Sequence, residues 1–420
     1  MTDHWTPPWT SGLDFSPGLL TFEWTLLLAL AALAGHWLQR VTSLPKVVGY
    51  AVVGALAGLV MEGAQWPLAG VGLFLLELGI AVVLFEAGGR LPLRWFRHNP
   101  MVLLQSVAES VLTFAAAFVL LRALGLDVKV VRALAIIAVA ASPAVLMRVT
   151  ADLRAGGPVT DRATALATLN TLYALTLGTA MLRTIDRGED SLLASIGLSL
   201  TVLGVSALAG AALVLALLGA LRVLRPTSQD TAIVVLTLIA TCTAGAAPLG
   251  ASAPLAALLA GLLLRQLHPR PWVWPRQLGT AASMLGILMF VLVSMMAVQA
   301  HWDVQVLWIA LALIAVRAGA KVASLLLTGW RSGLALRQTL WVGAALVPMS
   351  SVALLLTSQF VVASHSVGSQ VAAIALPVIL ITELLGAVLL AVALRRAGEA
   401  AGPQRHPSRA SLTGAEDTRP

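Results

Sequence analysis

The chain has 420 residues, of which 59% are hydrophobic and only 11% are charged, and its formal net charge is +8. Soluble domains carry about 25% charged residues, so this chain cannot form a fully water-exposed surface and is expected to lie in lipid. The single cysteine, Cys242, excludes an internal disulfide and a cysteine metal site. The sequence also lacks a catalytic Ser-His-Asp set, a P-loop and a dinucleotide fingerprint, so we expect neither an enzyme nor a cofactor.

Apolar stretches of spanning length, separated by short polar loops, recur along the chain. A helix needs about 20 residues to cross the hydrocarbon core of a bilayer. Stretches near or above this length lie at 19–38, 44–61, 68–88, 100–121, 133–151, 163–182, 192–221, 231–248, 252–267, 278–299, 304–328, 337–358 and 369–394. They predict an all-α polytopic membrane protein of about thirteen transmembrane helices. The predicted domains are an extracytoplasmic segment at 1–18, a transmembrane transporter domain at 19–397 and a disordered cytoplasmic tail at 398–420.

The distribution of lysine and arginine between the loops predicts the orientation of the chain. Twenty of these residues follow odd-numbered predicted helices, whereas five follow even-numbered ones. Because cytoplasmic loops carry the excess of positive charge, the N-terminus is expected outside and the C-terminus in the cytoplasm of a bacterial-type inner membrane. The positive net charge thus follows from topology in a lipid bilayer, and no nucleic-acid partner is expected.

Two of the predicted helices carry a proline near the middle. The fifth contains Ser142-Pro143 and the twelfth contains Pro348-Met349-Ser350. A proline inside a helix removes one backbone hydrogen bond and kinks or breaks the helix, and we expect the adjacent serine hydroxyls to bind the freed carbonyls. Counted around the long seventh helix, both prolines fall on the fifth helix of a six-helix half. Matching interruptions predict two inverted repeats whose broken helices cross at mid-membrane and form a binding site there.

Ionisable side chains within predicted spans are the second indication of a site, because each costs about 2.5–3.5 kcal/mol or more at mid-membrane. The deepest carboxylates are Glu77, Glu109 and Glu383. Each is either paired with a basic group or helix end, or takes part in proton coupling. Every aspartate is expected in a loop or tail, so none is available to hold a cation.

Arg317 and Lys321 lie in the eleventh predicted helix, four residues apart and therefore on one side of it. Two like charges on a buried face must be offset by carboxylates, carbonyl groups or a bound anion. Lysine is the basic residue that burial deprotonates most readily. We therefore expect at least one of the two in the site, unless Lys321 extends to the cytoplasmic edge of the membrane.

Short motifs along these helices are similar to those of one family. They are, in chain order, Leu44-Pro-Lys-Val-Val-Gly-Tyr50 with Gly54 and Gly58, Leu84-Phe-Glu-Ala-Gly88, Ser142-Pro-Ala-Val145, Ala257-Leu-Leu-Ala-Gly-Leu-Leu263 and Thr382-Glu-Leu-Leu-Gly386. This order resembles the monovalent cation:proton antiporter superfamily, which has the sodium/hydrogen exchanger fold. The resemblance covers about residues 19–397.

The resemblance implies a homodimer in which a core of crossed broken helices moves against a dimerisation domain and exchanges Na⁺ or K⁺ for protons. In that family the sixth helix carries an Asn-Asp or Asp-Asp pair, and the eleventh carries a basic residue. The corresponding residues here are Asn170 and Thr171, with Arg317 or Lys321 as the basic group. A threonine hydroxyl can coordinate a cation but cannot release a proton at physiological pH.

Three functions remain open on the sequence alone. Glu77, Glu109 or Glu383 carries the proton in a cation:proton antiporter, which is the favoured interpretation. Alternatively, the basic site at Arg317 and Lys321 binds a small anion such as an organic acid, assisted by the N-termini of the half-helices. In the last alternative the protein transports nothing and acts as a membrane sensor.

Overall fold

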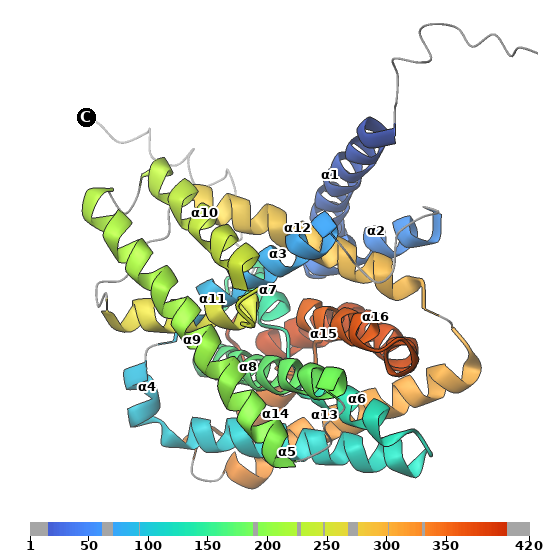
Figure 1. Cartoon of the computed structure of the whole chain (residues 1–420). Coiled ribbons are helices and arrows are strands. Elements are labelled where there is room, and N and C mark those ends of the chain that lie inside the picture. Colours follow the sequence, from blue (N-terminus) through green and yellow to red (C-terminus); the bar gives the residue numbers. More distant parts are fainter. Residues whose placement is uncertain are drawn as a thin grey trace, which may run out of the picture.

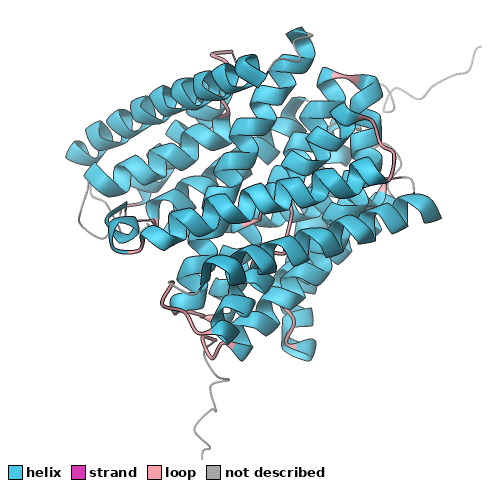
Figure 2. Ribbon diagram, turned by 90° about the horizontal axis from the view of Figure 1, so that it is seen from below, coloured by secondary structure: helices cyan, strands magenta, loops and turns pink. Residues whose placement is uncertain are grey.

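The computed structural model describes residues 16–60, 70–91, 93–187, 192–224, 228–246, 248–267, 276–300, 302–329 and 332–400. Within these ranges every regular element is an α-helix, and the connections are short (Figure 2). Most of the predicted terminal segments, at 1–15 and 401–420, lie outside the described residues. The helices are α1 (Ser16–Thr42), α2 (Lys46–Val60), α3 (Gly70–Gly89), α4 (Leu93–His98), α5 (Pro100–Ala123), α6 (Val128–Val139), α7 (Pro143–Leu153), α8 (Pro158–Arg187), α9 (Leu192–Val223), α10 (Gln229–Ala246), α11 (Ala253–Leu267), α12 (Arg276–Val298), α13 (Val304–Gly329), α14 (Leu336–Ala345), α15 (Ser351–Ala363) and α16 (His365–Arg396).

Each apolar stretch predicted from the sequence coincides with a helix or with two consecutive helices. The fifth stretch is divided into α6 and α7, and the twelfth into α14 and α15. In the described part of the chain, nine spans are long and apolar enough to cross a membrane, and α2, α11 and α15 are apolar but shorter. The prediction of an all-helical, multi-pass membrane protein is therefore confirmed. The count of thirteen spans, the inverted repeats and the orientation stay predictions.

The helices pack as two bundles. The first contains α1–α3 and α9–α12, with α3 against α11 and α2 against α12. The second contains α5–α8 and α13–α16, with α5 against α13 and α15 against α16. Figure 1 shows α15 and α16, in red, between α12 of the first bundle and α6 and α8 of their own. Both broken helices belong to the second bundle, so both helix breaks lie on the same side of the interface between the two bundles, which we call the seam.

Glycine permits the closest backbone approach in the first bundle, between α3 and α11. A Cβ atom on Gly261 would fall on the carbonyl oxygen of Phe85, and one on Gly88 would fall on that of Leu258. Small residues at helix contacts are the usual means by which membrane helices approach closely, since lipid provides little hydrophobic drive for their association. These two glycines come from the Leu84–Gly88 and Ala257–Leu263 motifs, whose function is thus partly structural.

Candidate ion-binding site

The first helix break separates α6 from α7 at residues 140–142. Pro143 occupies the first turn of α7. Backbone N–H groups in the first turn have no acceptor within the helix, so the absence of an N–H on proline costs nothing there. Ser142 caps the same helix, since its Oγ accepts a hydrogen bond from the N–H of Val145 at 3.2 Å. The sequence therefore ends one helix and begins the next, and the predicted break is confirmed in preference to a simple kink.

The second break separates α14 from α15 at residues 346–350 and contains Pro348 and Ser350. It touches the first break directly, because the N–H of Ser142 donates to the carbonyl oxygen of Pro348 at 3.1 Å. Gly386 of α16 packs against the same proline, and a Cβ added there would lie 2.9 Å from Pro348 Cα. The two interruptions thus meet at one point, as their matched positions in the sequence predicted.

The carbonyl groups freed by the breaks bind Arg317 of α13, which is fully buried. Its Nε donates to Ala138 O at 2.7 Å, and its Nη2 donates to Ala140 O at 2.6 Å, both at the end of α6. Nη1 donates to Val347 O, and Nη2 lies 3.4 Å from Leu346 O, at the end of α14. A guanidinium is suited to this position because its five donors form a planar fork. The expectation that serine hydroxyls bind the freed carbonyls was wrong, because Arg317 reaches both helix ends at once.

Lys321, one turn further along α13, forms a buried ion pair with Glu109 Oε1 of α5, and neither side chain is exposed. Its Nζ also lies 3.3 Å from Val139 O at the end of α6. The other oxygen of Glu109 accepts a hydrogen bond from Asn170 Nδ2 of α8 at 2.5 Å. Three helices thus bring Glu109, Asn170 and Lys321 together beside the first break, and Lys321 does not extend to the membrane edge.

Thr171 is fully buried beside Asn170 and faces the first break. Its hydroxyl oxygen lies 3.0 Å from Ala141 O and 2.8 Å from Ala167 O, and it donates to these carbonyls. A hydroxyl can make this contact, whereas an ionised carboxylate has no proton to donate. Thr171 therefore joins α8 to the unwound segment.

Glu383 and Glu77 lie apart from this cluster. Glu383 of α16 is fully buried at the second break, where Ser350 Oγ donates to Oε1 at 3.0 Å and Ser294 Oγ donates to Oε2 at 2.9 Å. Glu77 of α3 is half-buried and hydrogen bonds to Gln359 of α15. Of the three deep carboxylates predicted from the sequence, only Glu109 shares an ion pair with a described basic residue.

The family model for the transmembrane region of sodium/hydrogen exchangers matches residues 25–396. The chain belongs to this family. Two structures of the sodium proton antiporter MjNhaP1 from Methanocaldococcus jannaschii have the same fold. The match to the structure at pH 8 has a TM-score of 0.71 and 16% sequence identity. It covers 92% of this chain and 99% of the MjNhaP1 chain. The second, from electron microscopy, has a TM-score of 0.66 and 15% identity with the same coverage. No curated protein matches the chain significantly.

The structure also has a polar contact set between its two bundles that the sequence did not reveal. Asp152 of α7 lies 3.7 Å from Lys46 Nζ and 3.8 Å from Arg148 Nε, and it accepts the N–H of Lys46 at 3.2 Å. Arg148 donates to the hydroxyl of Tyr50 at 2.6 Å. The expectation that every aspartate lies in a loop was wrong, since α7 continues through Asp152 and the first bundle covers it. The four-residue spacing of Arg148 and Asp152 was the available signal.

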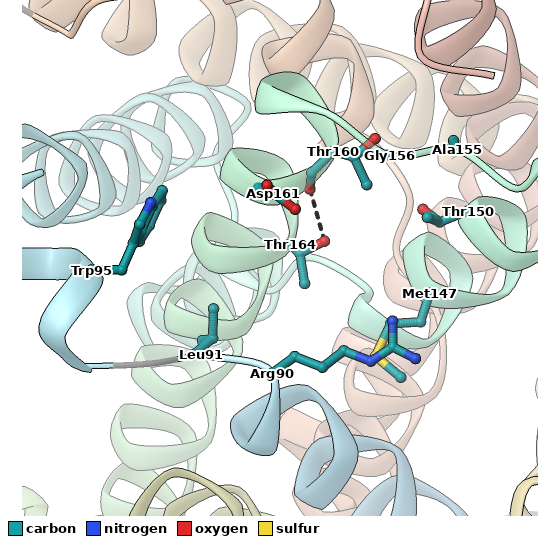
Figure 3. A pocket seen from close by; sticks show the side chains of 10 residues that line it. All are labelled: Arg90, Leu91, Trp95, Met147, Thr150, Ala155, Gly156, Thr160, Asp161 and Thr164. Carbon is teal, nitrogen blue, oxygen red and sulfur yellow. Dashed lines mark hydrogen bonds between the residues drawn. The ribbon is translucent and has the colours of Figure 1, made fainter. Parts of the chain in front are cut away.

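A pocket of about 330 Å³ lies near the start of α8, between the α3–α4 turn and the α7–α8 turn. Figure 3 shows Thr160, Asp161 and Thr164 of α8 near the centre, with Trp95 to their left and Arg90 below them. Thr164 is six residues before Asn170, or about 9 Å along the helix. A second pocket of about 170 Å³ shares Arg90 and Met147 with the first and extends to Ala144, beside the first break.

Proposed function

We propose that the protein is a secondary active transporter that exchanges a monovalent cation, Na⁺ or K⁺, for protons, and that Glu109 supplies the carboxylate of its binding site. The observation that carries this proposal is the contact of Glu109 with both Asn170 and Lys321. The aspartate expected at position 171 is absent, but a carboxylate from α5 lies in the same cluster. Family membership supports cation:proton exchange as the class of reaction, and the choice between Na⁺ and K⁺ is left to the experiment below.

The ion pair has the properties that an exchange site requires. The ammonium of Lys321 lies between Glu109 Oε1 and Val139 O, and carboxylate and carbonyl oxygens are the groups that replace the hydration shell of Na⁺ or K⁺. A cation that takes this place requires Lys321 to release a proton, because two positive charges cannot share one carboxylate. Either occupant leaves Glu109 paired, which avoids an unpaired buried charge.

Lys321 is the proton carrier in this scheme and Arg317 is not. An arginine side chain stays protonated in proteins, whereas a lysine can lose its proton when buried. Arg317 is moreover held by carbonyl groups of both helix breaks, so its movement would disturb the crossing itself. The two basic residues that the sequence could not rank thus receive different roles, one as a carrier and one as a clamp.

The two pockets offer a route for the cation between the bundles. They share Arg90 and Met147 in their linings, and the smaller one reaches Ala144, two residues after Ser142. By the positive-inside rule this end of α8 faces the cytoplasm. A cation entering there passes Asp161, which lines the larger pocket.

The two alternative functions have less support. An anion site needs a positive charge without a partner, yet Arg317 donates to four carbonyl groups and Lys321 is paired with Glu109. A membrane sensor has no need for a buried ion pair next to a helix break, where removing one partner costs about 3–5 kcal/mol. The sensor alternative is nevertheless distinct in experiment, because it predicts no flux of any ion.

Everted membrane vesicles with a pH-sensitive dye test the proposal. Addition of Na⁺, K⁺ or Li⁺ to vesicles with an acidic interior is expected to release protons and restore the fluorescence. Glu109→Gln is expected to reduce this signal to that of vesicles without the protein, and Lys321→Arg is expected to do the same because a guanidinium keeps its proton. Glu23→Gln is the matched control, since Glu23 is exposed on α1.

Two results would contradict the proposal at different levels. A correctly folded wild-type protein that responds to none of the three cations would exclude cation:proton antiport. Full activity of the Glu109→Gln protein would instead exclude Glu109 as the site carboxylate and leave the reaction class intact. Thr171→Ser keeps the hydroxyl that binds Ala141 O and Ala167 O, so it is expected to retain most of the activity.

A further inference from the structure

A second buried carboxylate, Glu383, lies at the seam between the two bundles. We propose that Glu383 is a second proton-carrying group of the transport cycle, so that two protons are exchanged for each cation. The inference rests on the proposed function, because it adds a proton to the exchange at Glu109 and Lys321. It follows from the contacts of Glu383, from the absence of a counter-charge within the described residues and from its position between the bundles.

The contacts of Glu383 suit a carboxyl group that gains and loses a proton. Both of its oxygens accept hydrogen bonds from serine hydroxyls, at 3.0 Å from Ser350 and 2.9 Å from Ser294. A hydroxyl can rotate to donate to a carboxylate or to accept from a protonated carboxyl, so the same two side chains serve both forms. Glu109, by contrast, is held in one form by the ammonium of Lys321.

No described basic residue lies within ion-pair distance of Glu383. Within the helices that pack against α16, the charged side chains have other positions or partners. Arg317 binds carbonyl groups and Lys321 binds Glu109, while Arg148 and Lys46 both contact Asp152. The remaining ionisable residues of these helices lie near helix starts or bind Arg148, and they are Lys129 and Arg132 of α6, Arg276 of α12, Arg337 of α14 and Tyr50 of α2.

An ionised carboxylate in the membrane interior is unfavourable without a counter-charge, so the protonated form has the lower free energy in the state described here. The ionised form is still accessible. Ser350 is the residue before α15, and the positive N-terminal end of that helix dipole stabilises a nearby negative charge. Loss of the proton therefore requires a change in the surroundings of Glu383 that admits water or removes a neighbouring apolar group.

Movement of one bundle against the other supplies such a change. Ser350 belongs to the second bundle, like Glu383, whereas Ser294 lies on α12 of the first. A sliding motion along the seam breaks the bond to Ser294 and keeps the bond to Ser350. The Glu383 O–H bond then breaks on one side of the membrane with release of the proton to water. It forms again from water on the other side, and each cycle moves one net charge.

The stoichiometry of purified protein in liposomes tests this inference without depending on rates. With the membrane potential removed by permeant thiocyanate, the cation gradient that stops net flux gives the number of protons per cation. For two protons a tenfold proton gradient balances about a 100-fold Na⁺ gradient, and for one proton it balances about a tenfold gradient. The wild-type protein is expected to show the larger value and Glu383→Gln the smaller, with exchange retained. Glu23→Gln is expected to match the wild type.

Each outcome bears on a stated claim. A wild-type protein that balances at one proton per cation overturns the inference, and this measurement needs no variant. A Glu383→Gln protein that keeps two protons per cation also overturns it, because a purely structural Glu383 predicts an unchanged ratio. Should that variant fail to fold, Glu383→Asp keeps a titrating carboxyl and is expected to retain two protons per cation. A wild-type protein without any exchange contradicts the proposed function itself.

Discussion

Replacement of Arg317 by alanine is the sharpest structural perturbation that the crossing offers. The side chain is fully buried and donates to carbonyl oxygens at the ends of both α6 and α14. Alanine removes all of these donors at once and leaves the ends of two helices without a partner. We therefore expect Arg317→Ala to destabilise the protein as a whole and not only to impair transport.

The magnitude follows from the number of groups left unpaired. A hydrogen bond from a charged donor contributes about 1.5–3 kcal/mol, and Arg317 makes three close ones, to Ala138, Ala140 and Val347. The full sum is an upper limit, because water and local relaxation satisfy part of the freed carbonyls. We expect a loss of about 3–5 kcal/mol for Arg317→Ala, which is at the upper end for a single substitution. Arg317→Lys is expected to lose about half as much, since an ammonium lacks the fork that reaches both helix ends.

Thermal unfolding of detergent-solubilised protein, followed by size-exclusion chromatography at a fixed heating time, measures these differences. The matched control is Arg122→Ala, because Arg122 is exposed and donates to the single carbonyl of Leu126 at 2.8 Å. An Arg317→Ala protein with the midpoint of the Arg122→Ala protein would refute the clamp. Such a result would also reopen the alternative in which Arg317 binds an anion.

Two further predictions concern packing and the end of the transmembrane region. Gly261→Ala is expected to lower stability by about 1–3 kcal/mol because the added methyl group meets Phe85 O. Gly204→Ala is the control: its methyl group has open space, so it is expected to be neutral or slightly stabilising in the same thermal assay. Glu399→Gln is expected to lower the free energy of unfolding by about 0.5–2 kcal/mol. The Glu399 carboxylate accepts hydrogen bonds from the N–H groups of Val159 and Thr160 at the start of α8, at 2.7 and 2.8 Å. Unchanged protease sensitivity near residue 156 would contradict this prediction.

The fold was accessible from the sequence because its signals are local. Length and apolarity define each span, and Pro143 and Pro348 act on the backbone of their own helices. The four-residue spacing of Arg317 and Lys321 predicted that both would be buried on one side of α13, as they are. None of these inferences required knowledge of which helices are neighbours.

The partners of the site residues were not accessible for the opposite reason. Glu109 and Asn170 lie 61 positions apart, and Lys321 lies 212 positions from Glu109. Three deep carboxylates were equally good candidates in the sequence, and only the packing of α5 between α8 and α13 distinguishes Glu109. Arg317 binds backbone carbonyl oxygens, and every residue has one. No sequence signal could therefore have identified which of them it binds.

The charges at the crossing are balanced without a carboxylate at position 171. The C-terminal end of a helix carries about half a negative elementary charge, and Arg317 binds the ends of both α6 and α14. Its positive charge is thus matched by two helix dipoles, while Lys321 is matched by Glu109. A carboxylate at position 171 would add a negative charge for which the described residues of the crossing hold no further cation. In the proposed site the carboxylate on α5 takes the place of one on α8, and the hydroxyl of Thr171 donates to the unwound backbone at Ala141.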